Sequence, residues 1–150
     1  MRVDLGTVAD LEEWTRLRHA LWPDAEASVH REEIASILRD PSNAAGFLCR
    51  DQDGSVLGFA EVALRHDYVN GCQSSPVGFL EGIFVQPASR GRGAARALCH
   101  AAEQWVRSRH CMEFASDTDL SNLAGQKLHA ALGFVETERV VFYRKVLTSE

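Results

Sequence analysis

The sequence lacks the features that mark secreted, membrane-spanning and nucleic-acid-binding proteins. Its four cysteines form no CxxC pair and no zinc-ligand spacing, so neither a disulfide framework nor a metal site is expected. No run approaches the ~20 apolar residues that cross a bilayer, and the N-terminus carries acids where a signal peptide has an apolar core. The formal net charge of −5 argues against a nucleic-acid partner. We therefore expect a cytoplasmic protein with reduced thiols that binds neither membranes nor nucleic acid.

What is present is the composition of an ordinary globular protein. At 150 residues the chain is expected to form a single domain, 1–150, around one core. The apolar spacing predicts helices over about 10–21, 30–39, 91–110 and 123–132, and strands over 2–5, 46–50, 56–65, 79–85, 112–116, 135–138 and 140–146. A strand–helix–strand crossover would place two parallel strands at the centre of an otherwise antiparallel α+β sheet.

The most informative stretch is 79–96, which reads FLEGIFVQPASRGRGAAR. An apolar strand leads here into a glycine-rich helix start. Gly91 and Gly93 remove the Cβ atoms that would hold a pyrophosphate away from the backbone, and the helix N-terminus directs its amides at such an anion. An ordinary turn and helix cap is the alternative. The pattern indicates a site for a phosphorylated cofactor, and hence an enzyme.

The same strand carries a carboxylate, Glu81, in an otherwise apolar run. A buried carboxylate is costly without a partner, so it needs either a structural ion pair or a function. Contact with substrate, or general-base catalysis, is the functional interpretation.

Two motifs resemble those of the GNAT superfamily of N-acetyltransferases: Arg90-x-x-Gly93-x-Ala95 after an apolar strand, and Asn122 followed by Leu132-Gly133-Phe134. Further segments are similar to the aminoglycoside 6′-N-acetyltransferases, and together they span nearly the whole chain: LWPD (21–24), RHDYVNGC (65–72), SSPVGFLEGIFV (74–85), ASDT (115–118) and LGFVETERVVFYRK (132–145). The resemblance implies the GNAT fold, a mixed, mostly antiparallel twisted sheet with two splayed parallel central strands, flanked by about four helices.

The resemblance also implies the reaction. Acetyl-CoA donates an acetyl group to the 6′-amine of an aminoglycoside antibiotic by direct attack in a ternary complex, which confers resistance, and no metal is needed. The family often forms homodimers, and the apolar segment 140–146 would pair across such an interface. The residues that match the family's cofactor site are Ile83, Phe84, Val85, Gly91, Arg92, Gly93, Ala94, Ala95, Arg96 and Asn122. Asn122 is also a favoured helix N-cap, and the two roles are compatible.

The residues that match the family's substrate side are Trp22, Tyr68, Glu81, Asp117 and Glu138. Glu81 is the candidate general base, directly or through water. Each of the others has a simpler alternative, because Trp22 and Tyr68 could be packing aromatics and the two acids could be turn or cap residues. His129 stands where many members of the superfamily carry the tyrosine that protonates the departing thiolate, so the general acid stays unassigned.

Two other functions fit the same fold. One is an acetyltransferase for another small amine or for a peptide N-terminus, and the other is an acyl-CoA-binding regulator without turnover. Spaced acids and aromatics favour a small polycationic substrate over a peptide.

Overall fold

The computed structural model describes residues 1–149. The chain from Met1 to Asp117 forms one compact unit, and the chain from Thr118 onward forms a second. The first unit contains β1 (Arg2–Leu5), α1 (Leu11–Leu21), α2 (Ala27–Arg39), β2 (Ala44–Arg50), β3 (Val56–Arg65), β4 (Val77–Val85), α3 (Ala94–Ser108) and β5 (Phe114–Ser116), with 3₁₀ turns at Val8–Asp10 and Pro87–Ser89. The second unit contains α4 (Leu123–Ala131).

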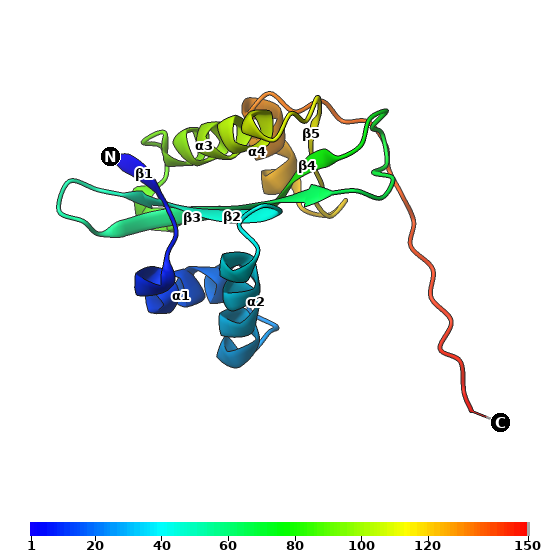
Figure 1. The fold of residues 1–150 in the computed structure, drawn as a ribbon, viewed down its shortest axis with the longest axis horizontal. Helices are drawn as coiled ribbons and strands as arrows, with labels where there is room; N and C mark the ends of the chain where they lie inside the picture. Colours follow the sequence, from blue (N-terminus) through cyan, green and yellow to red (C-terminus); the bar gives the residue numbers. More distant parts are fainter. Residues whose placement is uncertain (150) are drawn as a thin grey trace. The chain divides into compact units, whose positions relative to one another are not determined.

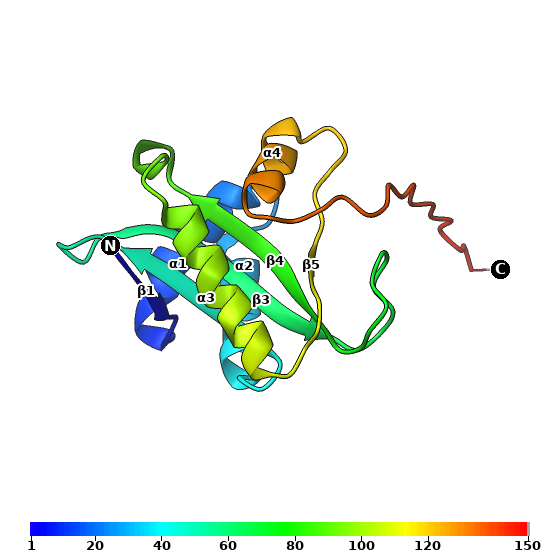
Figure 2. The same ribbon diagram turned by 90° about the horizontal axis from the view of Figure 1, so that it is seen from above.

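The strands form one sheet in the order β1-β2-β3-β4-β5. The first four strands are antiparallel neighbours, whereas β4 and β5 are parallel and are joined through α3. Helices α1 and α2 cover one face of this sheet and α3 covers the other (Figure 1). Seen from above, α3 lies along the strands (Figure 2). The predicted mixed, mostly antiparallel sheet with a parallel pair is confirmed.

The two strands predicted at 135–138 and 140–146 are wrong, because these residues form neither strand nor helix. Their valines and aromatic residues favour extended backbone. A strand forms, however, only where a neighbouring strand supplies hydrogen-bond partners, and no strand among residues 1–149 pairs with them. As a result β5 lies at the edge of the sheet, and the parallel pair is not central as predicted.

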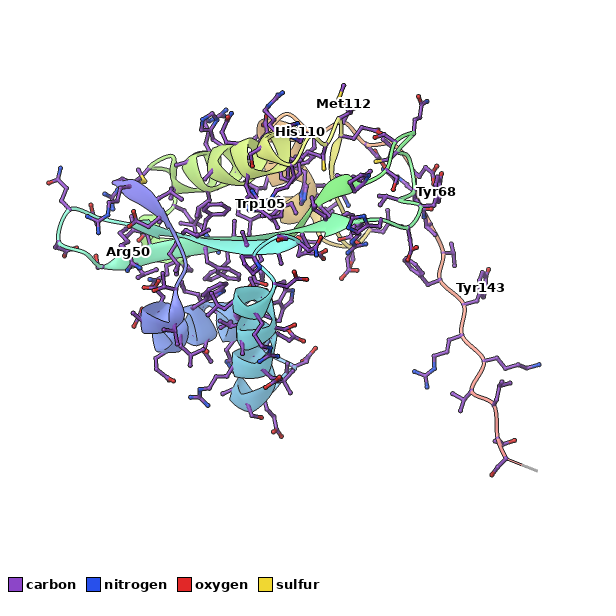
Figure 3. All side chains as sticks on the ribbon, viewed as in Figure 1. Arg50, Tyr68, Trp105, His110, Met112 and Tyr143 are labelled. Atoms are coloured by element: carbon purple, nitrogen blue, oxygen red, sulfur yellow. The ribbon has the colours of Figure 1, made fainter. Side chains whose placement is uncertain are left out.

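Both faces of the sheet are packed. Under α1 and α2 lies a buried cluster of six apolar side chains: Trp14, Leu17, Ile34, Leu48, Val56 and Phe59. On the other face α3 buries Leu98, Ala102, Trp105 and Val106. Figure 3 shows Trp105 between this helix and the sheet. Among residues 1–149, no helix has both the length and the apolar character that spanning a membrane requires.

A charged network is buried within the α1–α2 side of the core. Arg18 of α1 donates to both carboxylate oxygens of Glu61 on β3, and Trp14 Nε1 donates to the same carboxylate over 2.8 Å. Arg18 and Glu61 are only 3% and 4% exposed. Burial raises the pKa of the Glu61 carboxyl, and the guanidinium opposes that shift. The ion pair therefore links α1 to β3, and each buried charge is stabilised by the opposite charge of its partner.

Removing the charge of Glu61 should destabilise the protein strongly. Glu61→Gln removes the buried counter-ion of Arg18 and leaves only Glu33, whose side chain is 56% exposed, so we expect the free energy of unfolding to fall by about 3 kcal/mol. The control is Glu103→Gln, which removes an exposed α3 ion pair with Arg107 and should change stability by less than about 0.5 kcal/mol. Denaturant unfolding measures both variants. Equal stability of the two would show that the buried pair does not hold α1.

Candidate active site

Strand β4 changes face at Glu81. Its neighbours Leu80 and Gly82 pair with consecutive residues of β3, Val62 and Glu61, so Glu81 itself has no partner in the ladder. This is a β-bulge, an irregularity that re-aims side chains and recurs beside active sites. On one side of the bulge, Gly78 faces Val106 of α3; on the other, Gly82 faces Trp22 at the end of α1.

The Glu81 carboxylate is paired with Arg65 at the end of β3. Arg65 Nη2 lies 2.8 Å from Oε2 and Nε lies 3.1 Å from Oε1, while the guanidinium carbon stands 3.5 Å from the centre of the Phe79 ring. The Glu81 side chain is one-third exposed. The ion pair that the sequence left open as an alternative is thus present, on a carboxylate that solvent still reaches.

Trp22 lies against the same stretch of β4. A Cβ atom at Gly82 would stand 2.5 Å from Trp22 Cη2 and 2.6 Å from Cζ2, so only glycine lets the indole lie this close to the strand. The ring also meets Phe59 edge-on, with 6.0 Å between centroids. Trp22 is half-buried. The structure therefore brings Trp22 next to the bulge that carries Glu81.

Tyr68 lies on the loop between β3 and β4, where its side chain is 75% exposed (Figure 3). Val69 of this loop packs on Phe79, the residue whose ring supports Arg65. The far end of the loop is tied to Glu113, whose carboxylate accepts the amide hydrogens of Gln73 and Ser74 over 2.9 and 2.8 Å, and also the Ser74 hydroxyl. The hydrogen bonds from Ser74, with that from Gln73, lower the pKa of Glu113.

Asp117 directly follows β5 and is exposed. Strand β5 runs parallel to β4. Asp117 therefore lies just beyond the carboxyl end of the segment in which the two strands pair. Its contact with a substrate stays a prediction.

The parallel pairing ends at the bulge, because β5 ends at Ser116. The β4–β5 ladder covers only Gly78, Phe79 and Leu80. The predicted cofactor-binding segment Ile83, Phe84 and Val85 is paired on one edge only, to Ala60, Phe59 and Gly58 of β3. On its other edge this segment pairs with no strand among residues 1–149. An unpaired edge is the arrangement expected where a strand binds an extended ligand arm.

The loop after β4 has the backbone of an anion cradle. Gly91 and Gly93 adopt φ of 80° and 88°, in the left-handed region, and a Cβ at either position would meet nothing within 4 Å. The first hydrogen bond of α3 runs from Ala97 N–H to Gly93 O, so the preceding amides are directed out of the helix N-terminus. These amides belong to the predicted residues Ala94, Ala95 and Arg96. Open space, left-handed glycines and a helix of 15 residues together fit a pyrophosphate.

The arginines of the loop have protein partners. Arg92 forms an ion pair with Asp51 of the β2–β3 turn, with both nitrogen–oxygen distances 3.2 Å, and Arg90 Nε donates to Val85 O over 2.9 Å. Arg90 thereby fixes the loop to the end of β4. The predicted phosphate contact of Arg92 would add to its bond with Asp51.

Three of the predicted residues lie in the second unit. Asn122 is the N-cap of α4, and its side chain accepts from Gly125 N–H over 2.9 Å. His129 Nδ1 lies 2.7 Å from Gly125 O, so Nδ1 carries a hydrogen and donates it to that carbonyl. Glu138 is exposed in the segment without regular structure. The structural role of Asn122 is observed, and the functional roles of all three stay predictions.

The cysteines are unpaired thiols, and burial raises the pKa of Cys99 to about 11. Over residues 1–149, no group of three or more His, Cys, Asp or Glu side chains is arranged to hold a metal ion.

Sequence reasoning missed Arg65 and Glu113, which act on predicted site residues. Arg65 is the last residue of its strand, and only the β3–β4 register shows that it lies beside Glu81. Glu113 precedes a short strand and is 39 residues from Ser74. No local pattern marks either contact, although the polar turn-forming loop that Glu113 ties was itself recognisable.

Comparisons with known proteins agree with this geometry. The model of the Acetyltransferase (GNAT) family matches residues 10–134, which include residues of both units. The aminoglycoside N(6′)-acetyltransferase type 1 of Serratia marcescens is 54% identical over 138 residues, covering 92% of this chain and 94% of that protein. The protein of the same name from Stenotrophomonas maltophilia is 50% identical over 142 residues, covering 95% and 91%.

Solved structures give the same result. AAC(6′)-Iy in complex with the bisubstrate analogue CoA-S-monomethyl-acetylneamine has a TM-score of 0.91 and 47% identity over 97% of each chain. Apo AAC(6′)-Ig from Acinetobacter haemolyticus has a TM-score of 0.93 and 38% identity over 99% of this chain and 100% of that chain. The family model matches more than half of the chain and the relatives share up to 54% of its sequence, so the chain belongs to the GNAT family of acetyltransferases.

Proposed function

We propose that this protein transfers the acetyl group of acetyl-CoA to the 6′-amine of aminoglycoside antibiotics and so confers resistance to them. Its relatives carry that activity in their names, and one of their structures holds CoA joined to acetylneamine. The observation that carries the proposal is the continuous stretch 79–96. It places a solvent-accessible carboxylate on a β-bulge and, ten residues later, an anion cradle at a helix N-terminus.

The cofactor half of the site consists of the exposed edge of β4 and the following loop. Ile83 to Val85 offer backbone groups to the pantetheine arm, and the amides of 91–96 hold the pyrophosphate. Bound there, acetyl-CoA supplies the thioester carbonyl that the amine attacks. A β4 amide at this edge would stabilise negative charge developing on the carbonyl oxygen.

The substrate half must hold a polycation and still release a proton from one amine. An alkylammonium group titrates near pH ~10, and carboxylates placed around it favour the charged form. We therefore assign Asp117 and Glu138 to other amines of the substrate, Trp22 and Tyr68 to the sugar rings, and Glu81 to the reacting amine. Since Arg65 occupies both oxygens of Glu81, the base role requires one oxygen to exchange its guanidinium contact for the amine or a water.

Release of free CoA thiol with different amines tests the proposed substrate. With acetyl-CoA in excess, we expect turnover with kanamycin, and kcat/KM at least about a hundredfold lower with spermidine or a peptide, which lack the sugar rings that Trp22 and Tyr68 would contact. Preferential turnover of spermidine or peptides would reassign the substrate. Tight acetyl-CoA binding without release of CoA thiol in the presence of any amine would instead indicate an acyl-CoA-binding regulator without turnover.

The division of labour among the carboxylates predicts different kinetic effects of two charge-neutral substitutions. Glu81→Gln should lower kcat by about 10²- to 10⁴-fold, because it removes a proton acceptor. Asp117→Asn should chiefly raise the KM for the aminoglycoside, by about tenfold, because it removes one charge-assisted contact. Steady-state kinetics at saturating acetyl-CoA separate the two constants. A loss of kcat in Glu81→Gln no greater than in Asp117→Asn would contradict the base role.

We further propose that the protein is a cytoplasmic homodimer. The unbridged cysteines suit a reducing compartment. The segment that forms no strand within one chain exposes apolar side chains, with Val141, Phe142 and Tyr143 at 73%, 87% and 92% exposure, and Figure 3 shows Tyr143 projecting from it. Exposed apolar segments of this composition commonly mark an interface.

Gel filtration with light scattering tests the dimer. We expect the mass of two chains for the wild type, and the mass of one chain for Phe142→Lys, because a buried interfacial lysine lacks a counter-ion. Val8→Lys, at a 74% exposed position distant in sequence, is the control and should remain dimeric. A monomeric wild type at concentrations used for assays would rule the proposal out.

A further inference from the structure

A buried histidine lies beneath Trp22. His30, in the first turn of α2, is 1% exposed. Its Nε2 lies 3.0 Å from the carbonyl oxygen of Trp22, and its Nδ1 lies 3.2 Å from Nε of Arg18. The imidazole is also nearly parallel to the Trp22 indole, at 21° with 6.5 Å between ring centroids. His30 thus contacts both the backbone and the ring of a residue at the proposed substrate face.

The two hydrogen bonds fix the tautomer of His30. An arginine side chain has only donors, so Nδ1 must be the acceptor and carry no hydrogen. Nε2 then carries the single hydrogen of a neutral imidazole and donates it to Trp22 O. Protonation at Nδ1 would set a donor against a donor and would break the contact with Arg18.

Arg18 cannot relieve that conflict by turning away. Its guanidinium is bonded to Glu61 of β3 and to Glu33 of α2, and its Cζ lies 4.8 Å from the centre of a Trp22 ring. The indole therefore lies over Arg18 and against Gly82, and its backbone carbonyl is held by His30. Since Trp22 is the last residue before Pro23 and closes α1, this carbonyl contact also fixes the turn between the two helices.

We propose that His30 is a positioning residue for the transfer reaction: its Nε2–H bond to the Trp22 carbonyl and its Nδ1 contact with Arg18 together hold the indole against Gly82 for the aminoglycoside, and protonation at Nδ1 loosens that hold by breaking the contact with Arg18. The inference rests on the proposed substrate role of Trp22. It assigns His30 no contact with either substrate.

The charges around His30 set the direction of the pH effect. Arg18 and the exposed His19 face it from α1, Glu33 lies on its own helix and Glu61 on β3, and both acids are engaged with Arg18. Burial lowers the pKa of His30, the hydrogen bond to the Trp22 carbonyl opposes that shift, and the charges of Arg18 and His19 add to it. The folded state therefore favours the neutral ring. The contribution of His30 to stability is complete at pH values above the unfolded pKa of about 6.5. That contribution is lost as the pH falls from about 6.5 through the lowered pKa of the folded state.

Acrylamide quenching of tryptophan fluorescence reports on the indole directly. The chain has three tryptophans, of which Trp14 and Trp105 are 0% and 9% exposed, so quenching arises mainly from Trp22. We expect quenching of the wild type to rise as the pH falls below about 6.5 while far-UV circular dichroism stays constant. His19→Gln is the control and should keep this dependence. Quenching that is flat with pH, in folded wild-type protein, would overturn the proposal.

Two substitutions separate the two nitrogens of His30. His30→Gln places an amide donor near the position of Nε2 and should keep quenching low at every pH. His30→Asn reaches only the position of Nδ1, so it should lose the Trp22 contact and show high quenching at every pH. Gly82→Ala displaces the indole without changing His30, so its acrylamide quenching gives the reference value for a displaced Trp22 ring.

Kinetics complete the test at neutral pH. In His30→Asn the KM for the aminoglycoside should rise about tenfold, equivalent to about 1.4 kcal/mol, with kcat and the KM for acetyl-CoA within about twofold of wild type. His30→Gln should restore the wild-type KM. Altered quenching with an unchanged KM would overturn the positioning role and place the error in the substrate role of Trp22. A fall in kcat alone would overturn it as well, since His30 would then act on the chemical step.

Discussion

The β-bulge at Glu81 is the constraint on which the rest of the candidate site depends. Because Glu81 has no partner on β3, the strand turns its side chains from one face of the sheet to the other within three residues. The first half of β4 can then pack against α3 while Gly82 receives Trp22 from α1. The bulge also lies where the parallel ladder to β5 ends, so the following backbone is left with one unpaired edge. The position of the Glu81 carboxylate, the position of Trp22 and the unpaired edge of β4 therefore share one origin.

Buried charge beneath the bulge maintains this arrangement. Arg18 and Glu61 are each nearly inaccessible to water and satisfy one another, while Arg18 also orders His30 and lies under the Trp22 ring. An apolar core of the same volume would often be as stable or more stable. A charged network in this position has a second consequence, since His30 is hydrogen-bonded to the Trp22 carbonyl and the Arg18 guanidinium packs against the indole. The stability of the core and the position of Trp22 therefore both depend on the Arg18 guanidinium.

Local patterns in the sequence were enough for much of the fold. The α3 face, the strands up to β4 and the glycine turn at 91–93 follow from spacing and backbone preference, because neighbouring residues determine them. The bulge, the Arg65–Glu81 ion pair and the hydrogen bonds that Glu113 accepts from the β3–β4 loop join residues 16 to 40 positions apart. Only the strand register brings these residues together. The predicted C-terminal strands failed for a related reason: valine and tyrosine favour extended backbone, but a strand also needs a partner that residues 1–149 do not supply.

In the proposed mechanism the bulge aims Glu81 at the amine to be acetylated, and a crystal structure of the protein with CoA and kanamycin measures that distance. We expect the 6′-nitrogen to lie within about 3.2 Å of a Glu81 oxygen or to be joined to it by one water, with Arg65 retaining at most one of its two contacts. A bound aminoglycoside whose 6′-nitrogen lies far from Glu81, with the Arg65 pair intact, would contradict that mechanism.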